Sequence, residues 1–363
     1  MKTLIFGDMS PTPKTAPLFE KGDIDSLFYD TTELFHDNDI NFVNLECALT
    51  HHDVAIKKWG PPLKAAPETA NTLKRVGVNV CGLSNNHIFD YGKKGALDSI
   101  ENLEKAGIMH TGFGNDYNDS RNNLVIEKNG EKVCIIAVCE HEYSYALSDR
   151  MGSRPYDEYN TIEDIRDAKE ENDCVIVIYH GGKELCQYPS TRLRRACQAM
   201  ARAGADVVIC QHSHCIGCYE EYENCHILYG QGNFHFVGFE AIQTPEIWDS
   251  CLAVKYDTQS KKIDFVPVVA HNLGITIAKG DARDKILNSF NERNESLHNG
   301  KWIDGWKEFC QSVKQSYIEI IQNAKSDDLT EKYNNLFGHY LDCEAHTDVW
   351  RELFPTYNQT NEK

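Results

Sequence analysis

The chain has 363 residues, of which 41% are hydrophobic and 25% are charged, and its mean hydropathy is −0.50. This composition excludes a disordered chain, a collagen-like repeat and a polytopic membrane protein. The formal net charge is −18, from 37 basic and 55 acidic residues. No nucleic-acid partner is expected, because no cluster of lysine and arginine offers the basic face that phosphate backbones require.

The first three quarters of the chain alternate apolar runs with helix-patterned segments. The apolar runs predict strands at Thr3–Phe6, Phe42–Leu45, Val78–Leu83, Val133–Val138, Val175–Tyr179, Val207–Cys210, Ile227–Tyr229, Leu252–Tyr256 and Ile263–Val269. Segments of mixed polarity predict helices at Pro67–Val76, Gly95–Ala106, Thr161–Lys169 and Ser190–Ala203. Continuous Val and Ile runs are typical of strands buried on both faces, and the alternation predicts an α/β fold.

After about Ile277 the pattern predicts helices alone, at Asp281–Arg293, Lys301–Ala324 and Thr330–Leu341. In the middle helix, apolar residues recur at three- and four-residue steps and form one face: Trp302, Trp306, Phe309, Val313, Tyr317 and Ile320. We expect this face to pack on the α/β body, with a partner-binding surface or a lid as the alternative. The expected organisation is one domain over residues 1–276 and a helical extension over residues 277–363, packed on the core.

Fourteen cysteines do not form a disulfide pattern, because several lie inside the apolar runs, where a free thiol behaves as a small hydrophobe. The first residues show no secretory leader, and no apolar run approaches the ~20 residues that span a bilayer. We therefore expect a cytoplasmic protein with no membrane span.

Residues that metal ions prefer stand at the ends of predicted strands. They are Asp8, Glu46, the Asn85–His87 run, His180, His212 and His214. Sites form at strand ends in α/β sheets, because loops converge there on a rigid scaffold. A lone histidine after a strand is usually structural, but ligand-type residues at five strand ends favour a metal site. Two carboxylates, an amide oxygen and several imidazoles suit Mn, Fe or Zn.

A second metal interpretation involves the cysteines around the paired histidines. Cys210, Cys215, Cys218 and Cys225 include one Cys-x-x-Cys, with Cys215 and Cys218 as the best ligands for a structural zinc. The second pair that such a site normally needs is absent from this stretch, and Cys210 lies in an apolar run. The set of histidines and carboxylates is therefore the leading interpretation.

The ordered set of motifs resembles a known family. The motifs are Gly7-Asp8, Asn44-Leu45-Glu46, Ser84-Asn85-Asn86-His87 with Asp90-Tyr91-Gly92, His180-Gly181-Gly182 with Glu184, His212-x-His214, and Tyr229-Gly230-Gln231-Gly232-Asn233-Phe234. Together they resemble the CapA-like, poly-γ-glutamate capsule synthesis family of the calcineurin-like metallophosphoesterase superfamily. The resemblance covers roughly residues 1 to 275 and leaves the helical extension uncovered.

The resemblance implies a four-layer αββα sandwich that holds two divalent metal ions at the sheet ends. It assigns the ligands residue by residue: Glu46 as the bridging carboxylate, Asp8 and His214 for the first ion, and Asn86, His180 and His212 for the second. The superfamily has an imidazole where this chain has Ser10. The first ion is therefore expected to be held more weakly than the second.

Five further residues are expected around the substrate. The resemblance places His87 at the leaving group, where it stabilises or protonates the departing oxygen, with Asp90 orienting its imidazole. Asn85 and Lys58 are expected to contact an anionic group, and a solvated loop lysine is the alternative for Lys58. Asn233, just after a strand, is expected to hydrogen-bond to substrate or to close a turn.

These features predict a metal-dependent hydrolase that uses a metal-activated water on a phosphate ester or anhydride. Its expected substrate is a small anionic or phosphorylated molecule. One alternative rests on the resemblance alone: a capsule or poly-γ-glutamate biosynthesis or polymer-processing factor that acts on an anionic polypeptide and has a metal site with little or no phosphatase activity. Another is an inactive, metal-bearing interaction protein that docks through the Trp302–Ile320 face.

Overall fold

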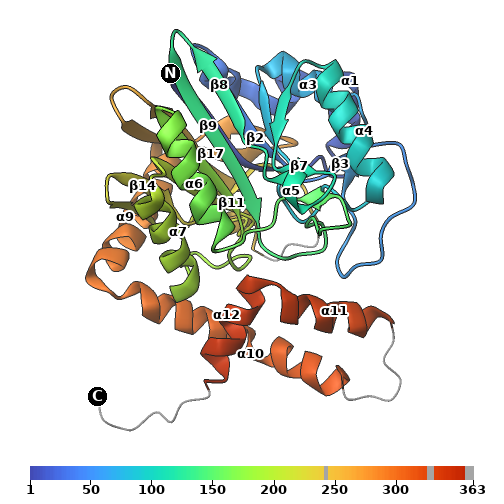
Figure 1. Cartoon of the computed structure of the whole chain (residues 1–363), viewed down its shortest axis with the longest axis vertical. Coiled ribbons are helices and arrows are strands. Elements are labelled where there is room, and N and C mark those ends of the chain that lie inside the picture. The colour runs from blue at the N-terminus through green and yellow to red at the C-terminus, as the bar shows by residue number, and fades with distance from the viewer. Residues whose placement is uncertain (241–243, 325–330, 356–363) are drawn as a thin grey trace.

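Two β-sheets lie at the centre of the computed structural model, which describes residues 1–240, 244–324 and 331–355 (Figure 1). The larger sheet has the order β18-β17-β16-β1-β2-β5-β6, with β15 beside β1. Its strands are β1 (Lys2–Met9), β2 (Ile40–Leu45), β5 (Val80–Gly82), β6 (Met109–Thr111), β15 (Asn233–His235), β16 (Ser250–Asp257), β17 (Lys262–His271) and β18 (Gly274–Ile277). Strands β1, β2, β5 and β6 run parallel, and β16 is antiparallel to β1.

The smaller sheet has the order β13-β14-β12-β11-β9-β8. Its strands are β8 (Leu124–Lys128), β9 (Glu131–Cys139), β11 (Cys174–His180), β12 (Val207–Gln211), β13 (Tyr219–Tyr222) and β14 (Cys225–Leu228). The four inner strands are parallel, and the edge strands β8 and β13 are antiparallel to their neighbours. Two short ladders join β3 (Ala48–Leu49) to β4 (Lys64–Ala65) and β7 (Phe113–Gly114) to β10 (Gly152–Ser153).

Helices cover the outer faces of both sheets. Those against the larger sheet are α1 (Ala16–Lys21), α2 (Ile24–Phe28), α3 (Thr69–Val76) and α4 (Gly92–Lys105), with a 3₁₀ helix at Tyr29–Phe35. Those against the smaller sheet are α6 (Asn160–Glu171) and α7 (Thr191–Ala203). Short helices α5 (Tyr117–Ser120) and α8 (Pro245–Trp248) lie in connections.

Alternating side chains of the buried strands belong to different hydrophobic clusters. In β11, Ile176 joins a cluster that also contains Ile5 and Phe42 of the larger sheet, so this cluster fills the space between the sheets. Its neighbour Val177 joins a different cluster, which contains Leu193 of α7. Successive strand residues point to opposite faces, so both faces of the sheet are buried. The predicted α/β fold is confirmed.

The predicted elements agree with the structure where the apolar signal is strong. Each of the nine predicted strand runs overlaps a strand, and the four predicted helices of the α/β part overlap α3, α4, α6 and α7. Weaker elements were not predicted, such as the edge strand β8, whose residues are half-buried or exposed. An edge strand needs less apolar sequence because one of its sides faces solvent.

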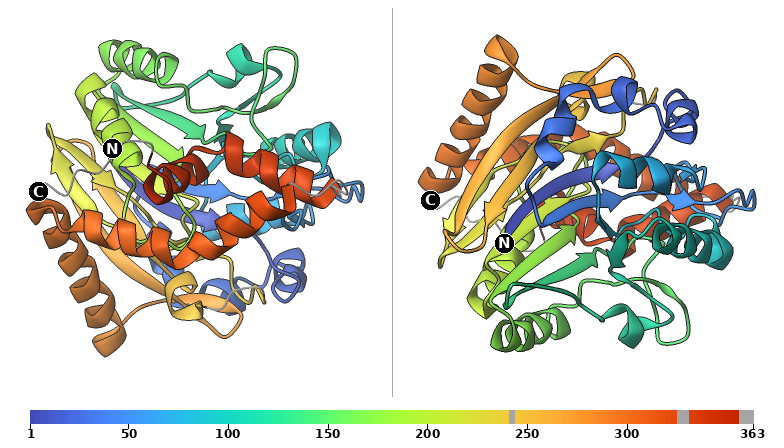
Figure 2. Two further views of the ribbon diagram at one scale, coloured as in Figure 1. Left: turned by 90° about the horizontal axis from the view of Figure 1, so that it is seen from below. Right: turned by 90° about the horizontal axis from the view of Figure 1, so that it is seen from above.

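In the described residues after β18 there are four helices: α9 (Gly280–Asn299), α10 (Trp302–Ala324), α11 (Glu331–Asp342) and α12 (Glu344–Leu353). Seen from below, α10, α11 and α12 lie across the ends of the strands (Figure 2, left). Trp306 and Tyr317 of α10 are buried in a cluster with Val349 of α12, and Trp302 packs in the cluster of α7. This face of α10 is therefore interior and not a docking surface. Thr330, the expected start of the third helix, lies outside the described residues.

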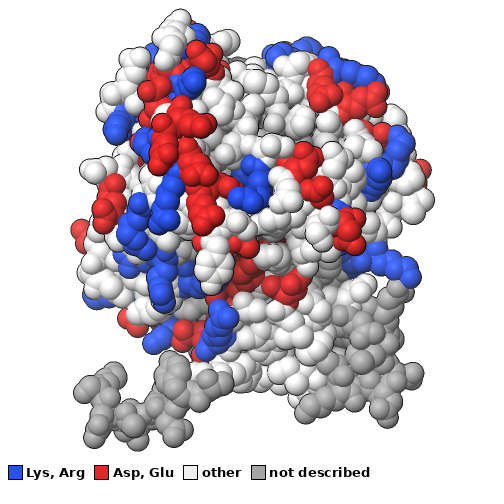
Figure 3. Space-filling view, in the orientation of Figure 1, with Lys and Arg blue, Asp and Glu red and all other residues white. Residues whose placement is uncertain are grey.

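The described part of the chain contains no helix both long enough and apolar enough to cross a membrane. All fourteen cysteines are buried free thiols. The face in Figure 3 carries acidic and basic side chains side by side, so among the described residues of this face neither sign forms a uniform surface.

Candidate metal centre

The predicted metal ligands meet at one edge of the two sheets, which we call the carboxyl edge because the parallel strands end there. Asp8 lies near the end of β1, Glu46 follows β2, and His180 is the last residue of β11. His212 and His214 follow β12. The sheets pack face to face, so strand ends from both arrive at the same place. All of these side chains are buried, and none is more than 5% exposed.

Two groups of ligand atoms share the carboxylate of Glu46. One group is Asp8, Glu46 and His214, the other is Glu46, His180 and His212, and within each the candidate atoms lie within 4.8 Å of one another. The Nε2 atoms of His180 and His214 lie 3.4 Å and 3.8 Å from the same oxygen, Oε1 of Glu46. The structure therefore brings the predicted ligands together in the two predicted sets.

Asn86 joins the second group, because its Oδ1 lies 3.0 Å from Nε2 of His180. The second group thus has four side-chain donors, whereas the first has three. Ser10 stands at the position where the resemblance implies a further imidazole, and it is fully buried. The first group therefore has fewer ligand side chains than the second, as the sequence led us to expect.

The chemistry of the shared carboxylate fits a divalent cation. Both oxygens of Glu46 are buried and lack a hydrogen-bond partner among the described residues. Burial and the nearby Asp8 carboxylate raise the pKa of Glu46 well above its ordinary value. A buried anion without a partner is strongly unfavourable, and a cation between the two groups would remove that cost. Carboxylate, amide and imidazole donors suit Mn, Fe or Zn.

Asp8 is held in its charged form. Burial alone raises the pKa of Asp8, but the hydrogen bond and charge of His180, the charge of His214 and the Asn44 amide together hold it below its ordinary value. Asn44 Nδ2 donates to Asp8 Oδ1 at 2.6 Å and lies 3.0 Å from Nδ1 of His180. Asn44 therefore fixes one side chain from each ligand group.

The backbone of the paired histidines is strained. His212 has a φ of 78° and His214 a φ of 52°, both in the left-handed region that residues other than glycine rarely adopt. Such conformations cost about 1–3 kcal/mol each and persist mainly at functional sites. The backbone N–H of His212 donates to Asp8 Oδ2 at 2.8 Å, and Asn233 Oδ1 lies 2.8 Å from Nδ1 of His214. These contacts hold the two imidazoles at the carboxyl edge.

His87 lies in a charged triad beside the second group. Its Nδ1 is 2.6 Å from Asp90 Oδ2, and Lys58 Nζ is 2.6 Å from Asp90 Oδ1 and 3.2 Å from the same imidazole nitrogen. Burial and the adjacent Lys58 charge lower the pKa of His87, so the imidazole is neutral at pH 7. The expected orientation of His87 by Asp90 is therefore present, with the positive charge on Lys58 instead.

The structure gives the predicted substrate contacts other partners. Asn85 donates to Asn44 Oδ1 and Leu45 O, and its Oδ1 accepts from two backbone N–H groups. Asn233 Nδ2 donates to Trp248 O while its Oδ1 faces His214. The ammonium of Lys58 is buried against Asp90, its side chain only 2% exposed. Since protein groups occupy these polar atoms, all three support the site from within.

Glu142 contacts the site but was not among the predicted site residues. Its Oε1 accepts from Asn86 Nδ2 at 2.9 Å, and its Oε2 lies 3.3 Å from Nε2 of His212. Although burial raises the pKa of Glu142, the neighbouring His339 and His212 lower it to about 2. The signal was an acidic residue just after β9, which ends at the same edge as β11.

The cysteine alternative receives no support from the geometry. Cys218 Sγ lies 3.4 Å from Gln187 O, and burial raises the pKa of both Cys215 and Cys218 to about 12. Among the described residues, neither convergent ligand group contains a cysteine.

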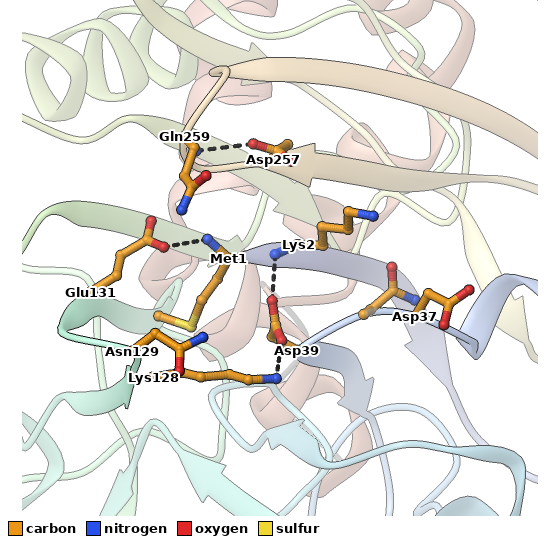
Figure 4. A pocket seen from close by; sticks show the side chains of 10 residues that line it. Met1, Lys2, Asp37, Asp39, Lys128, Asn129, Glu131, Asp257 and Gln259 are labelled. Carbon is orange, nitrogen blue, oxygen red and sulfur yellow. Dashed lines mark hydrogen bonds and ion pairs between the residues drawn. The ribbon is translucent and has the colours of Figure 1, made fainter.

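A depression of about 570 Å³ lies at the opposite edge, where β1 begins (Figure 4). It is lined by Met1 and Lys2 and by charged residues that pair with one another, such as Lys128 with Asp39. We call this the amino edge. The two ligand groups that share Glu46 are not there.

Comparisons with known proteins found neighbours by structure and relatives by sequence. A solved structure of a hypothetical protein from Thermus thermophilus covers 77% of this chain and 100% of its own, with 13% identity and a TM-score of 0.46. The capsule biosynthesis protein CapA of Bacillus anthracis is 31% identical over 180 residues, covering 48% of this chain and 44% of that protein. The PGA biosynthesis protein CapA of Bacillus subtilis (strain 168) is 28% identical over 236 residues, covering 63% and 62%.

A probable polyglutamine synthesis accessory protein of Mycobacterium tuberculosis (strain ATCC 25618 / H37Rv) is 26% identical over 208 residues, covering 54% of this chain and 55% of that protein. The chain spans about half the length of the curated relatives it matches. The model of the family described as bacterial capsule synthesis protein PGA_cap matches residues 2–237, the range that contains every predicted metal ligand. The chain belongs to this family.

Proposed function

We propose that the protein is a metal-dependent hydrolase of the calcineurin-like phosphoesterase type, acting on a phosphate ester or anhydride. The observation that carries the proposal is the shared carboxylate of Glu46, whose two oxygens are buried without partners between two groups of ligand atoms. His180 and His214 face one of these oxygens at 3.4 Å and 3.8 Å without a hydrogen bond to it, and a carboxylate and imidazoles arranged in this way suit ligands turned toward a common ion.

The proposed ligands are Asp8, Glu46 and His214 for one ion, and Glu46, Asn86, His180 and His212 for the other. When bound, two divalent ions lower the pKa of a shared water and neutralise the charge of a phosphoryl group. We further propose that the first ion is the more weakly held, because its group has fewer donors. Glu142 restrains the amide of Asn86, so that its Oδ1 stays directed at the site.

Residues around these ligands would orient the reacting groups. Asp90 fixes the Nδ1 side of His87, which leaves Nε2 as the atom that faces a leaving group. Lys58 neutralises Asp90, so the neutral imidazole is retained at pH 7. Asn44 and Asn233 hold Asp8 and His214 in place. Supporting hydrogen bonds of this kind typically change metal affinity or activity 10–100-fold.

We propose the same organisation for the fold as the superfamily has, a four-layer αββα sandwich over residues 1–276 with a helical extension over residues 277–363. The support is the cluster shared by the two sheets and the two outer clusters shared with helices.

A second candidate function is favoured by the names of the relatives. Two of them are named for capsule or PGA biosynthesis and one for polyglutamine synthesis. In this alternative the chain is a polymer biosynthesis or processing factor, and the carboxyl edge binds or processes an anionic polypeptide.

The test is metal content together with phosphatase activity. The full chain, purified without chelator, is analysed for Mn, Fe and Zn beside the variants His180→Ala and His212→Ala. His36→Ala is the matched control, because His36 is exposed and belongs to neither group of ligand atoms. We expect about two ions per wild-type and control chain, fewer in both ligand variants, and cleavage of at least one phosphomonoester, diester or nucleotide. Metal without any cleavage refutes the hydrolase and favours the polymer factor.

A further inference from the structure

Helix α8 places Trp248 against His214, a proposed ligand of the first ion. The centroids of the two rings are 4.4 Å apart, and the rings are tilted by 36°. Phe236 meets the same imidazole edge-on at 5.7 Å, and Trp248 meets Phe236 edge-on at 5.1 Å. The imidazole of His214 thus contacts two aromatic rings, and Trp248 comes from a segment beyond residue 237, where the family match ends.

The indole of Trp248 is held in one orientation. Its Nε1 donates a hydrogen bond to the backbone oxygen of Phe236 at 2.9 Å, and the residue is only 5% exposed. Phe239 stacks on the indole, with a distance of 5.5 Å between the ring centroids. An indole that is packed and has its N–H paired cannot easily move, so it restricts the rotation of a ring that lies against it.

The backbone oxygen of Trp248 acts on the same imidazole through Asn233. It accepts from Asn233 Nδ2 at 3.0 Å, so Oδ1 of this amide is turned toward Nδ1 of His214, 2.8 Å away. The other atom near Nδ1 is Oδ2 of Asp8 at 3.5 Å, which is also an acceptor. A neutral His214 therefore carries its proton on Nδ1, and Nε2 keeps the lone pair that a metal ion needs. Nε2 lies 3.8 Å from Oε1 of Glu46.

Trp248 differs from the other buried tryptophans in what surrounds it. Trp302 and Trp306 belong to hydrophobic clusters that include residues of α7 and α12. Among the described residues, none of the four hydrophobic clusters contains Trp248 or Phe236. Since His214 has a strained backbone and its group has only three side-chain donors, this ligand gains most from an added restraint.

We propose that Trp248 is a positioning residue of the first ion, which holds the imidazole of His214 so that Nε2 faces the shared carboxylate of Glu46. The inference rests on the metal centre of the proposed function and adds to it a residue outside the matched range. Groups that orient a metal ligand typically change metal affinity 10–100-fold. His214 belongs to only one of the two ligand groups, so loss of the indole weakens one ion and spares the other.

The first experiment measures the Kd of each Mn²⁺ binding step by calorimetry on the metal-free full chain. Trp248→Leu is expected to raise the Kd of the weaker step roughly 10-fold or more and to leave the tighter step unchanged. Trp248→Phe keeps a flat ring beside His214 and is expected to stay within roughly 3-fold of the wild type. Trp306→Leu is the matched control, because it removes a similarly buried indole from the helical extension and changes neither Kd.

The second experiment uses the indole as a reporter. Co²⁺ quenches tryptophan fluorescence at short range, so an ion held by His214 quenches Trp248. We expect the quenching that accompanies filling of the weaker site to be mostly lost in Trp248→Phe, in which this site still fills. The quenching is retained in Trp306→Phe. This measurement needs no enzyme activity and does not depend on whether Trp248→Leu folds.

The outcomes separate this inference from the proposed function. An unchanged weaker step in Trp248→Leu, an equal loss in Trp306→Leu, or full quenching in Trp248→Phe overturns the positioning role, while metal binding and hydrolysis stand. Metal binding that depends on Trp248, in a protein that cleaves no phosphate ester, supports the role and refutes the hydrolase. A wild type that binds fewer than two ions refutes both.

Discussion

The two edges of the sheets differ in whether their charged side chains have partners. At the amino edge, charged groups are paired: the Met1 ammonium lies 2.5 Å from Glu131, and Lys128 lies 2.5 Å from Asp39 (Figure 4). At the carboxyl edge, Glu46 is buried without a partner, and the backbone of two histidines is strained. An edge that is already neutralised needs no ligand, whereas the carboxyl edge carries costs that a bound cation would offset. Unsatisfied charge, more than the size of a depression, therefore marks the candidate site.

The largest expected effect comes from Glu46→Gln. The shared carboxylate serves both ligand groups, so its loss is expected to reduce metal content from about two ions per chain to none. Because burial and Asp8 raise the pKa of Glu46 well above its ordinary value, the neutral carboxyl is favoured when no cation is bound, so the neutral isostere is expected to leave the stability of the chelated protein within about 1 kcal/mol of wild type. Elemental analysis and denaturant unfolding in the presence of chelator measure the two effects.

Asp39→Asn is the matched control at the amino edge, where the same change removes a paired carboxylate. It is expected to leave metal content unchanged and to reduce stability by less than about 1 kcal/mol. If Glu46→Gln kept both ions, the contrast between the edges would not reflect metal binding.

Removal of metal from the wild type is expected to have the next largest effect. An ion present at a thousand times its Kd stabilises the folded state by about 4 kcal/mol, so chelation should lower the free energy of unfolding by a similar amount. Adding back Mn or Zn should restore it. Thermal unfolding with and without chelator makes the measurement, and Glu46→Gln should show no response to either treatment.

Two asparagines, one near each edge, allow the effects of equivalent substitutions on metal affinity to be compared. Asn44→Ala removes contacts to Asp8 and His180, and we expect metal affinity to fall 10–100-fold. Asn79→Ala removes equally local contacts, to Asn41 N and Asp39 O, near the other edge. It is expected to cost about 1–2 kcal/mol of stability with no change in metal affinity. Metal titration of both variants decides the point, and equal losses of affinity would contradict it.

The smallest effect concerns acid sensitivity of the amino edge. Although burial raises the pKa of Glu131, hydrogen bonds from the Met1 ammonium and Thr258 lower it below the ordinary value of 4.5. A carboxyl with a lowered folded-state pKa stabilises the fold above its unfolded pKa, and this contribution is lost as pH falls below about 4.5. Glu131→Gln should reduce stability at pH 7 by about 1 kcal/mol or less and should flatten its fall toward pH 3. Chemical unfolding across this pH range tests it.

A site residue could be predicted from the sequence where a single strand contains both the buried apolar residues and the ligand. His180 ends a run of buried apolar residues, so the same segment predicts both the strand and the position of the ligand at its end. Asp8 and His214 come from different sheets, so their meeting depends on the face-to-face packing of the two sheets, which the strand pattern alone does not show. The sequence alone does not show which polar atoms already have partners. Asn85 and Asn233 were therefore expected to meet substrate, although protein groups use their amides.

The rest depends on contacts between distant segments. Helix α12 was not predicted, although Ala345, Val349 and Leu353 recur at four-residue steps. Its place in the fold depends on a distant loop: Glu140 Oε2 accepts from Ala345 N, and Glu344 accepts from His141 N. His339 is brought to Glu142 only by the packing of α11, which no local pattern encodes. The apolar spacing in α10 indicated that its face is buried, but the pattern does not state what the face buries against.

The contacts between Glu140–His141 and Glu344–Ala345 join segments that are about 200 residues apart in the chain. At a synthesis rate of 5–20 residues per second, the loop after β9 emerges about 10–40 s before the segment that anchors it. Asp8 in β1, His180 in β11 and His214 after β12 are all synthesised before α12, so the carboxyl edge is nearly complete and still uncovered when α12 is made. If the proposed ions bind, they could enter this edge during translation, before the late helices dock over it.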